Sequence, residues 1–200
     1  MIEWIVDIDT WLFLQLNAGV ANAFFDRFMP FATEIRHLLW LVVPSLVALT
    51  VFGGGKGRRA VLFGLFLVTL TDQVSSHLLK PLIARPRPCH DVEGVRLLYR
   101  CGRTFAFPSS HAVNSMGAAI FFGILYRRWL WVLVVVAFLN SYSRVYLGIH
   151  YPFDVLGGWI LGGGMAWGMV RVFRSPIGKA LTRLRVFRDK PVRSPTENHA

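Results

Sequence analysis

The stretch Trp129–Asn140, WLWVLVVVAFLN, contains no charged residue, and its only strongly polar side chain is that of Asn140. A helix on the surface of a soluble bundle shows a polar stripe, and this stretch has none. Apolar side chains on every face are typical of a helix that is surrounded by lipid or by other apolar helices. We therefore expect Trp129–Asn140 to form the core of a membrane-spanning helix.

Four further stretches, residues 38–52, 60–79, 105–126 and 151–170, are almost free of charge. Their only Asp, Glu, Lys, Arg or His residues are Asp72, His77, His111 and Asp154. Helices of this length, at about 1.5 Å per residue, cross a hydrocarbon layer of about 30 Å when slightly extended or tilted. Charged residues make up only 16% of the chain. We predict an all-α, polytopic membrane helical bundle with five spans, the alternative being five buried helices of a soluble bundle.

The first 37 residues differ from these stretches because aromatic and polar side chains alternate in them. That mixture suits one or two helices lying in the membrane interface, and a sixth span is the alternative. No basic n-region with a small-residue cleavage site marks a signal peptide. We expect one domain, with an interfacial segment (1–37), a membrane domain (38–173) and a basic tail (174–200).

The net charge of +11 does not indicate nucleic-acid binding, because no nucleic-acid motif accompanies it. Eight Lys or Arg residues follow the last span, between Arg171 and Ala200, as is typical of a cytoplasmic end near anionic lipid. With alternating spans, the side holding GGGKGRR (53–59), Arg127, Arg128 and the tail carries thirteen basic residues, against nine on the other side. We expect the C-terminus in the cytoplasm and loops 80–104 and 143–150 outside it.

Three segments on that outer side contain most of the unusual polar residues. They are Lys80–Pro88 after the second stretch, Phe107–His111 in the third, and Ser143–Asp154 between the last two. Each has an ordinary explanation, because basic residues at helix ends reach toward lipid headgroups and Pro-Ser-Ser commonly begins a helix. Together, however, they place two histidines, one aspartate and several cations, among them Lys80, Arg87 and Arg144, at one membrane depth.

This set of side chains fits a phosphoryl group. Lys80, Arg87 and Arg144 can neutralise a phosphate dianion, the two arginines through bidentate contacts. Ser109 and Ser110 stand at the expected start of a helix, whose free N–H groups bind anions. We therefore predict that these five residues bind a substrate phosphate.

The two histidines and Asp154 are the expected catalytic residues. His150 and Asp154 are four residues apart, so that Asp154 can hold Nδ1–H of His150 and leave Nε2 free to attack phosphorus. His111 is expected to protonate the leaving oxygen, and then to act as a base when water hydrolyses the phosphohistidine. Carboxylates near the motifs are few, so we predict no metal ion and no cofactor.

These motifs resemble the three signatures of the type 2 phosphatidic acid phosphatase family over about residues 38–173. The matching residues are Lys80, Arg87 and Pro88; Pro108, Ser109 and His111; and Ser143, Arg144, His150 and Asp154. The resemblance implies a membrane helical bundle, a phosphohistidine mechanism without metal, and a site facing outward. Ser110 departs from the family's usual glycine, so its expected role in phosphate binding does not come from the resemblance.

Within the family, the short chain resembles bacterial members that act on undecaprenyl diphosphate or phosphatidylglycerol phosphate. We therefore expect a multi-pass protein of the bacterial inner membrane, with its active site toward the periplasm. Lipid A and phosphatidate phosphatases share the same motifs and are alternatives. The expected partners are a lipid phosphate and membrane lipids, not nucleic acid, and the sequence does not specify the oligomeric state.

Proteins of two other classes would also use a phosphate site. A lipid-phosphate binder or translocator would need the cations but no nucleophile, so the two histidines and Asp154 favour the enzyme. A vanadate-dependent haloperoxidase shares the site chemistry but is soluble, and the five apolar stretches argue against it.

The only two cysteines, Cys89 and Cys101, lie in the loop expected outside the cytoplasm. An oxidising compartment favours a disulfide between them, the alternative being two unrelated thiols. Zinc binding is disfavoured because His90 is the only other good ligand in the loop. For Asp72 and His77, inside a span, we predict hydrogen bonds between helices rather than contact with phosphate.

Overall fold

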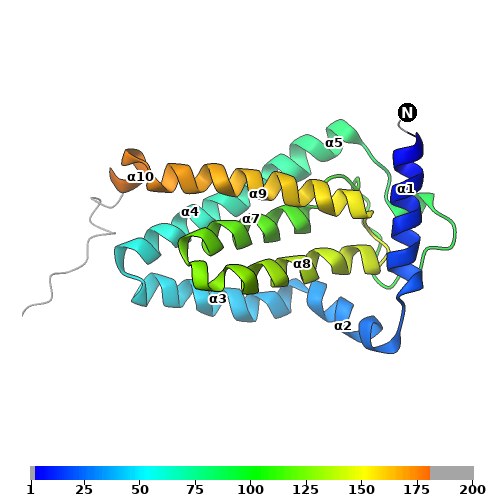
Figure 1. Ribbon diagram of the computed structural model, residues 1–200, viewed down its shortest axis with the longest axis horizontal. Helices are drawn as coiled ribbons and strands as arrows, with labels where there is room; N and C mark the ends of the chain where they lie inside the picture. The colour runs from blue at the N-terminus through cyan, green and yellow to red at the C-terminus, as the bar shows by residue number, and fades with distance from the viewer. Residues whose placement is uncertain (1–2, 181–200) are drawn as a thin grey trace, which may run out of the picture.

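The computed structural model describes residues 3–180, except for the side chains of Ile35 and Leu38. Within this range the regular secondary structure is entirely helical, as predicted, and the long helices lie side by side in a bundle (Figure 1). The bundle consists of α3 (Ile35–Phe52), α4 (Gly54–Gln73), α7 (Ser110–Leu125), α8 (Leu130–Tyr146) and α9 (Pro152–Arg174).

The outer surface of the bundle is apolar. Three helical segments, Gly54–Asp91, Arg127–Tyr146 and Pro152–Arg174, are long and apolar enough to cross a membrane, and Leu39–Phe52 and Ser110–Leu125 are shorter apolar helices. Large side chains on these helices are exposed, including Trp40 (82%), Trp131 (77%) and Ile160 (70%). So much exposed apolar surface requires lipid as the surrounding solvent, and the chain is a multi-pass membrane protein.

Helix α7 is central and packs most extensively against α9, then α8 and α4. Glycines allow the α7 and α9 backbones to approach closely. A Cβ atom on Gly162 would lie 2.2 Å from the carbonyl oxygen of Val113, and one on Gly158 would lie 3.0 Å from that of Ser109. This close approach fixes the first turns of α7 and α9 relative to each other.

Polar contacts also cross between α4 and α7. Asn114 Nδ2 donates to Asp72 Oδ1 at 3.2 Å, and Thr71 Oγ1 donates to Asn114 Oδ1 at 2.8 Å. The predicted interhelical hydrogen bond of Asp72 is therefore confirmed, while that of His77 stays a prediction.

The segment GGGKGRR (53–59), expected to connect two spans, is mostly helical. Helix α4 already begins at Gly54, which has a positive φ of 56°, and only Gly53 separates it from α3. A Cβ atom on Gly57 would lie 2.1 Å from the carbonyl oxygen of Leu49. The glycines thus permit a tight turn and close crossing of the two helices, which makes the connection shorter than predicted.

The N-terminal segment forms α1 (Glu3–Leu14), the π-helical turn η1 (Gln15–Gly19) and α2 (Ala23–Thr33). Helix α1 crosses one end of the bundle instead of running along it (blue, Figure 1). Asn17, which is fully buried, attaches this segment by donating to the carbonyl oxygens of Tyr146 at 2.7 Å and Arg96 at 2.9 Å. The predicted helices are present, and their position in the membrane interface stays a prediction.

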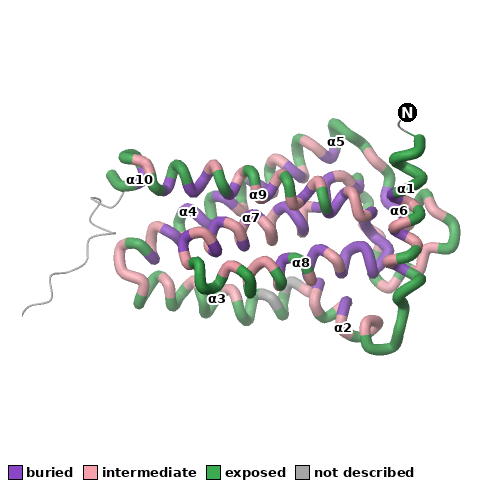
Figure 2. Tube along the Cα trace, viewed as in Figure 1, coloured by how far each residue is buried: buried purple, intermediate pink, exposed green. Residues whose placement is uncertain are grey.

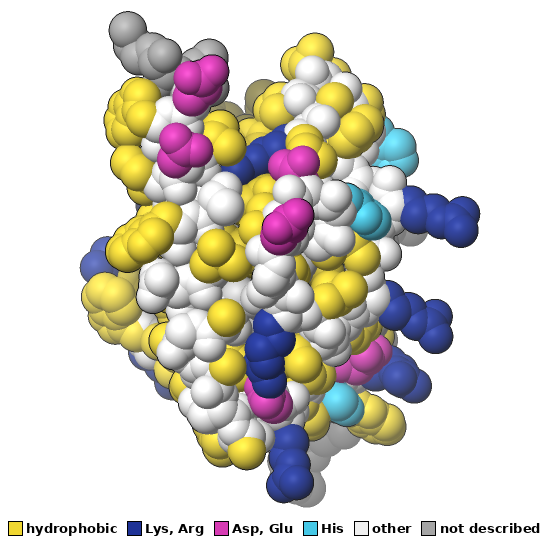
Figure 3. Space-filling model, turned by 90° about the vertical axis from the view of Figure 1, so that its right-hand side faces the viewer, with side chains coloured by type: hydrophobic (Ala, Val, Ile, Leu, Met, Phe, Trp, Pro, Cys, Tyr) yellow, Lys and Arg dark blue, Asp and Glu magenta, His cyan; other side chains and the backbone are white. Residues whose placement is uncertain are grey.

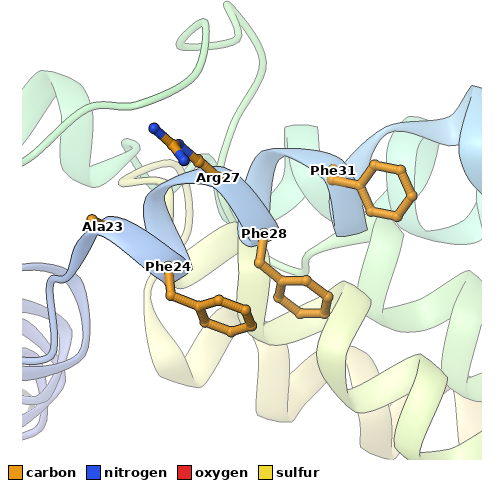
Figure 4. A pocket seen from close by; sticks show the side chains of 5 residues that line it. All are labelled: Ala23, Phe24, Arg27, Phe28 and Phe31. Carbon is orange, nitrogen blue, oxygen red and sulfur yellow. The ribbon is translucent and has the colours of Figure 1, made fainter.

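Helix α2 has two distinct sides. Phe24 and Phe28 point to one side with stacked rings 5.6 Å apart, and Arg27 points to the opposite side (Figure 4). Phe24 and Phe31 are exposed at 67% and 55%. On this side, Phe24 and Phe31 therefore remain largely exposed, whereas Phe28 packs against the core cluster that contains Met29 and Tyr146.

The long loop between α4 and α7 covers the same end of the bundle. Helix α4 continues through the π-helical turn η2 (Val74–Leu79) into α5 (Lys80–Ile83), and the loop contains the short α6 (Pro88–Asp91). Cys89 and Cys101 form a disulfide within this loop, as predicted. Figure 3 shows this end from outside, with Lys and Arg side chains projecting along one edge among hydrophobic side chains.

The opposite end of the bundle carries the turns between α3 and α4 and between α7 and α8, where the short 3-10 helix η3 (Arg127–Trp129) lies, together with α10 (Pro176–Ala180). Arg59 Nη1 donates to the carbonyl oxygen of Gly178 at 2.8 Å, which attaches α10 to α4. Most of the predicted basic tail (174–200) lies outside the described residues. Burial along α8 increases away from this end, and all of its buried residues lie between Ala137 and Tyr146 (Figure 2).

Candidate active site

The structure brings the predicted site residues together at the end of the bundle that α1 crosses. Lys80 begins α5, Ser109 precedes α7, Arg144 lies in the last turn of α8, and Asp154 lies in the first turn of α9. The predicted residues that are buried are Lys80, Arg87, Ser109, Arg144, His150 and Asp154.

His150 is held in a tight turn between α8 and α9. Its N–H and that of Ile149 both donate to the carbonyl oxygen of Arg144, at 3.2 and 3.1 Å. Gly148 adopts a φ of 83°, and a Cβ atom there would lie 2.9 Å from the carbonyl oxygen of Arg96. Glycine therefore satisfies both the left-handed backbone and the close contact, and the turn fixes the His150 backbone.

The contacts of the His150 ring define its tautomer. Arg87 Nη1 lies 3.3 Å from His150 Nε2, and Asp154 Oδ2 lies 3.4 Å from His150 Nδ1. An arginine only donates hydrogen bonds, so Nε2 is the accepting nitrogen and the proton lies on Nδ1. The lone pair of Nε2 therefore points toward the cations.

Asp154 is fully buried, and both of its carboxylate oxygens are bonded. Oδ2 accepts the N–H of Tyr151 at 2.9 Å besides facing His150, and Oδ1 accepts from Arg85 Nη1 at 2.8 Å. Holding a histidine through its other ring nitrogen is how proteins fix the orientation of a reactive imidazole.

Burial is the main reason why the pKa of His150 lies well below its usual value of 6.5. The nearby charges of Arg87, Arg144 and Lys80 lower this pKa further. His150 is therefore neutral at physiological pH, as a nitrogen nucleophile must be.

The three predicted cations are held by neutral acceptors rather than by carboxylates. Lys80 Nζ donates to the carbonyl oxygen of Phe105 at 3.2 Å, and Arg144 Nη1 donates to Thr33 Oγ1 at 2.6 Å. Arg87 donates through Nε and Nη2 to the carbonyl oxygen and hydroxyl of Thr104, at 2.7 and 2.9 Å. Their positive charges are thus positioned without being neutralised by these contacts.

His111 lies among the same groups. Arg144, His150, Lys80 and Arg87 are all close enough to interact electrostatically with its ring. His111 is the second residue of α7 and is partly exposed, unlike His150. The two histidines therefore approach one cluster of cations from different helices.

The start of α7 adds hydrogen-bond donors. The first N–H groups of a helix have no partner within the helix, and at α7 these include Ser110 and His111. Ser109 is fully buried, and within the described residues its hydroxyl and the Nε of Arg144 have no hydrogen-bond partner. The hydroxyl of Ser110 instead lies 3.2 and 3.0 Å from those of Ser75 and Ser76. Its predicted part in phosphate binding rests on its N–H.

Three residues that the sequence did not predict contact the predicted set, namely Thr33, Thr104 and Arg85. A fourth, Asp9, contacts Arg85. Arg85 could have been found from the sequence, because it stands two residues before Arg87 in the first motif. Asp9 and Thr33 lie in the N-terminal segment, whose docking on the site no local pattern reveals.

One group of metal-ligand side chains occurs in the part of the chain that the structure describes. Cys89, His90 and Cys101 bring their ligand atoms within 4.8 Å of one another. Both sulfur atoms are used in the disulfide, so this group does not offer thiolate ligands.

Unpaired cations beside a neutral histidine suit the hydrolysis of phosphate esters, and an apolar bundle surface presents that chemistry to lipids. These features define a membrane lipid phosphatase. The chain belongs to the PAP2 superfamily, which it matches over residues 61–176.

Two relatives and two solved structures illustrate this membership. The chain is 38% identical to a lipid A 4'-phosphatase of Bacteroides thetaiotaomicron, covering 84% of this chain and 77% of that protein. It is 31% identical to an undecaprenyl-diphosphatase of Sulfolobus acidocaldarius, covering 68% of this chain and 65% of that protein. Aquifex aeolicus LpxE shares the fold with a TM-score of 0.65, 24% identity and coverage of 82% and 95%. A phosphatidylglycerolphosphate phosphatase of Bacillus subtilis also shares the fold, with a TM-score of 0.66 and 23% identity, covering 90% of this chain and 89% of that one.

Proposed function

We propose that this phosphatase transfers a phosphoryl group from a lipid to Nε2 of His150 and then to water. The observation that carries this proposal is the state of His150, whose Nδ1 faces Asp154 while its Nε2 lone pair faces Arg87. A neutral imidazole in this orientation is a nucleophile aimed at the place where cations would hold a phosphate.

The first step forms a bond between His150 Nε2 and phosphorus and breaks the bond from phosphorus to the lipid oxygen. His111 gives its proton to that oxygen, so the lipid leaves as an alcohol or, from a diphosphate, as a monophosphate. The phosphate dianion beside His111 favours the protonated imidazole that this step needs. Water then attacks phosphorus, His111 accepts its proton, and the bond from phosphorus to Nε2 breaks.

Phosphate binding would exchange present contacts for new ones. Arg87 Nη1 moves from Nε2 of His150 to a phosphate oxygen, which frees the lone pair for attack. Ser109 Oγ, Arg144 Nε and the first N–H groups of α7 donate to the remaining oxygens, with Lys80 nearby. Such preorganised donors stabilise the charge that develops on phosphoryl oxygens, so this mechanism has no step that needs a metal ion.

Lipid A, or a lipid with a similar phosphorylated sugar headgroup, is the substrate that we propose. From the sequence alone we expect undecaprenyl diphosphate or phosphatidylglycerol phosphate, with lipid A as an alternative. The relatives favour that alternative, because lipid A 4'-phosphatases of Bacteroides thetaiotaomicron and Porphyromonas gingivalis are 38% and 31% identical to the chain. Undecaprenyl diphosphate is the second candidate, supported by the relative from Sulfolobus acidocaldarius.

We also propose that α3, α4, α7, α8 and α9 are five spans of a bacterial inner membrane, with the site toward the periplasm. The disulfide of the loop covering the site supports this orientation, since disulfides persist in oxidising compartments. The aromatic side of α2 supports an interfacial position for residues 1–37. The membrane domain then comprises residues 38–173, and the basic tail 174–200 is cytoplasmic.

The decisive experiment measures phosphate release by detergent-purified protein from four lipids in parallel. These are diphosphorylated lipid A, undecaprenyl diphosphate, phosphatidylglycerol phosphate and phosphatidate. We expect the highest kcat/KM with lipid A, full activity in EDTA, and a loss of several orders of magnitude in His150→Ala. More than a few per cent residual activity in that variant would contradict the role of His150, and rescue by magnesium after EDTA would contradict the metal-free mechanism.

A further inference from the structure

Helix α1 contributes one buried carboxylate to the surroundings of the site. Asp9 is fully buried, whereas Asp7 and most of the neighbouring residues of α1 are exposed. Asp9 Oδ1 accepts the N–H of Phe153, in the first turn of α9, at 2.9 Å. Asp9 Oδ2 forms an ion pair with Arg85 Nη2 at 2.7 Å.

Arg85 connects this carboxylate to Asp154. Its Nη1 donates to Asp154 Oδ1 at 2.8 Å, while its guanidinium carbon lies 4.0 Å from the centre of the Tyr151 ring. Asp154 Oδ2 in turn faces His150 Nδ1. A continuous series of contacts therefore runs from α1 to the imidazole: Asp9, Arg85, Asp154, His150.

The charges along this series explain why two carboxylates share one arginine. Arg85 alone would cancel the charge of Asp154, and little negative charge would remain to stabilise the Nδ1–H of His150. With Asp9 also ionised, the three side chains carry one net negative charge. Electrostatic interactions act strongly in a buried site, so this difference reaches the imidazole.

We propose that Asp9 is a positioning residue for the phosphatase reaction, which balances Arg85 so that Asp154 keeps its negative charge toward His150. This proposal rests on the proposed role of His150. It also gives α1 a part in catalysis although Asp9 lies outside residues 61–176, the range that matches the family. The contact with Phe153 N–H adds a geometric part, because it fixes α1 against the start of the helix that carries Asp154.

The first test compares Asp9→Asn with Asp7→Asn as the matched control on the same helix. An asparagine side chain is similar in shape to that of Asp9 and can still accept the N–H of Phe153, so the change removes mainly the charge. With the best substrate of the four lipids, we expect kcat to fall about 10- to 100-fold in Asp9→Asn, as for other residues that orient a reactive group. We expect KM to stay within about twofold, and Asp7→Asn to match the wild type.

The second test separates the charge role from a purely structural one. In the double variant Asp9→Asn/Arg85→Gln, Asp154 again carries an unbalanced negative charge toward His150. We expect it to turn over faster than Asp9→Asn alone. A structural role predicts the opposite, because the double variant loses both ion pairs, so a double variant no faster than Asp9→Asn overturns the charge role.

Two controls complete the comparison. Thermal unfolding of each variant in detergent shows whether it is folded, and the double variant decides the outcome even where Asp9→Asn is destabilised. His150→Ala is assayed alongside. If it stays active, the proposed mechanism fails; if it is inactive while Asp9→Asn turns over like the wild type, only the inference about Asp9 fails.

Discussion

Basic side chains lie near both ends of helix α7, and their electrostatic interaction with the helix dipole differs between the two ends. At its C-terminus, Lys56 Nζ donates to the carbonyl oxygen of Leu125 at 3.2 Å and lies 4.8 Å from the centre of the Tyr126 ring. That end of a helix is partially negative, so the contact is favourable without any ligand. At its N-terminus, Lys80, Arg87 and Arg144 lie near His111 in the first turn, where the helix end is itself partially positive and favours an anion.

This difference separates a charge that is satisfied within the chain from three charges that, in the proposed mechanism, bind the substrate phosphate. Lys56 is satisfied by groups of the chain itself. At the site end, Lys80, Arg87 and Arg144 are held by carbonyl and hydroxyl oxygens, which position them but leave their charge in place. A site that is electrostatically strained when empty binds a phosphate dianion more strongly, and the variants below test whether the two ends behave in this way.

The largest expected difference is in activity. Removing the charge at the site end, in Arg144→Gln, should lower kcat/KM about 10²- to 10³-fold, the usual effect of losing one preorganised donor to a reacting anion. The matched change at the other end, Lys56→Gln, should leave kcat/KM within about twofold. Phosphate release from the best lipid substrate measures both, and equal losses in the two variants would contradict the division of roles.

The next effect is stabilisation by an anion. Orthovanadate mimics the pentavalent phosphorus of the transition state, and at 100 times its Kd it should add about 2.7 kcal/mol to the free energy of unfolding. Thermal unfolding in detergent measures this gain. Lys56→Gln should keep it and Arg144→Gln should lose most of it, while a wild-type protein that is not stabilised by vanadate would argue against an anion site.

A smaller effect is the dependence of stability on pH. Because the pKa of folded His150 lies well below 6.5, the unfolded chain binds more protons than the folded one below pH 6.5. Stability contributed by this group is therefore present above pH 6.5 and is lost as the pH falls, by about 1 kcal/mol per unit until the folded pKa is reached. In His150→Asn the unfolding temperature should depend less on pH between pH 6.5 and 5 than in the wild type. An unchanged dependence on pH would contradict this account.

The smallest effect concerns the end away from the site. Lys56→Gln should lower the free energy of unfolding by about 0.5 kcal/mol, because it removes a cation from a helix C-terminus near the surface. High salt should reduce the difference between the two proteins, since such contacts are screened. A more stable Lys56→Gln protein would show that this cation, too, is in an unfavourable position.

Residues with strong local signals were predictable from the sequence. The apolar stretches located the bundle helices, because a span must be apolar on all sides. The spacing between His150 and Asp154 predicted their contact, although only Asp154 lies in a helix and His150 stands in the turn before it. The separate motifs could be combined because alternating spans bring all of them to the same end of the bundle.

Features that depend on docking between distant segments were not predictable. Asp9 and Thr33 come from helices whose mixed composition suggests only an interface, and their contacts with Arg85 and Arg144 form only once the chain is folded. The turn before α4 was expected to be longer, because clustered glycines are typical of loops. Here they permit close contact with α3 instead, which only the folded structure reveals. Similarly, the presence of Ser75 and Ser76 beside Ser110 depends on how η2, which continues α4, packs against α7.

The position of α1 across the site has a practical consequence for handling the protein. The described chain begins with α1, which crosses the end of the bundle where the candidate site lies, and it ends with α10 at the opposite end (Figure 1). An affinity tag or fluorescent fusion placed before Glu3 would stand beside the candidate site and pull on the helix that holds Asp9. The same addition after Ala180 would leave both undisturbed, so labels, surface tethers and fusion partners belong at the C-terminal end.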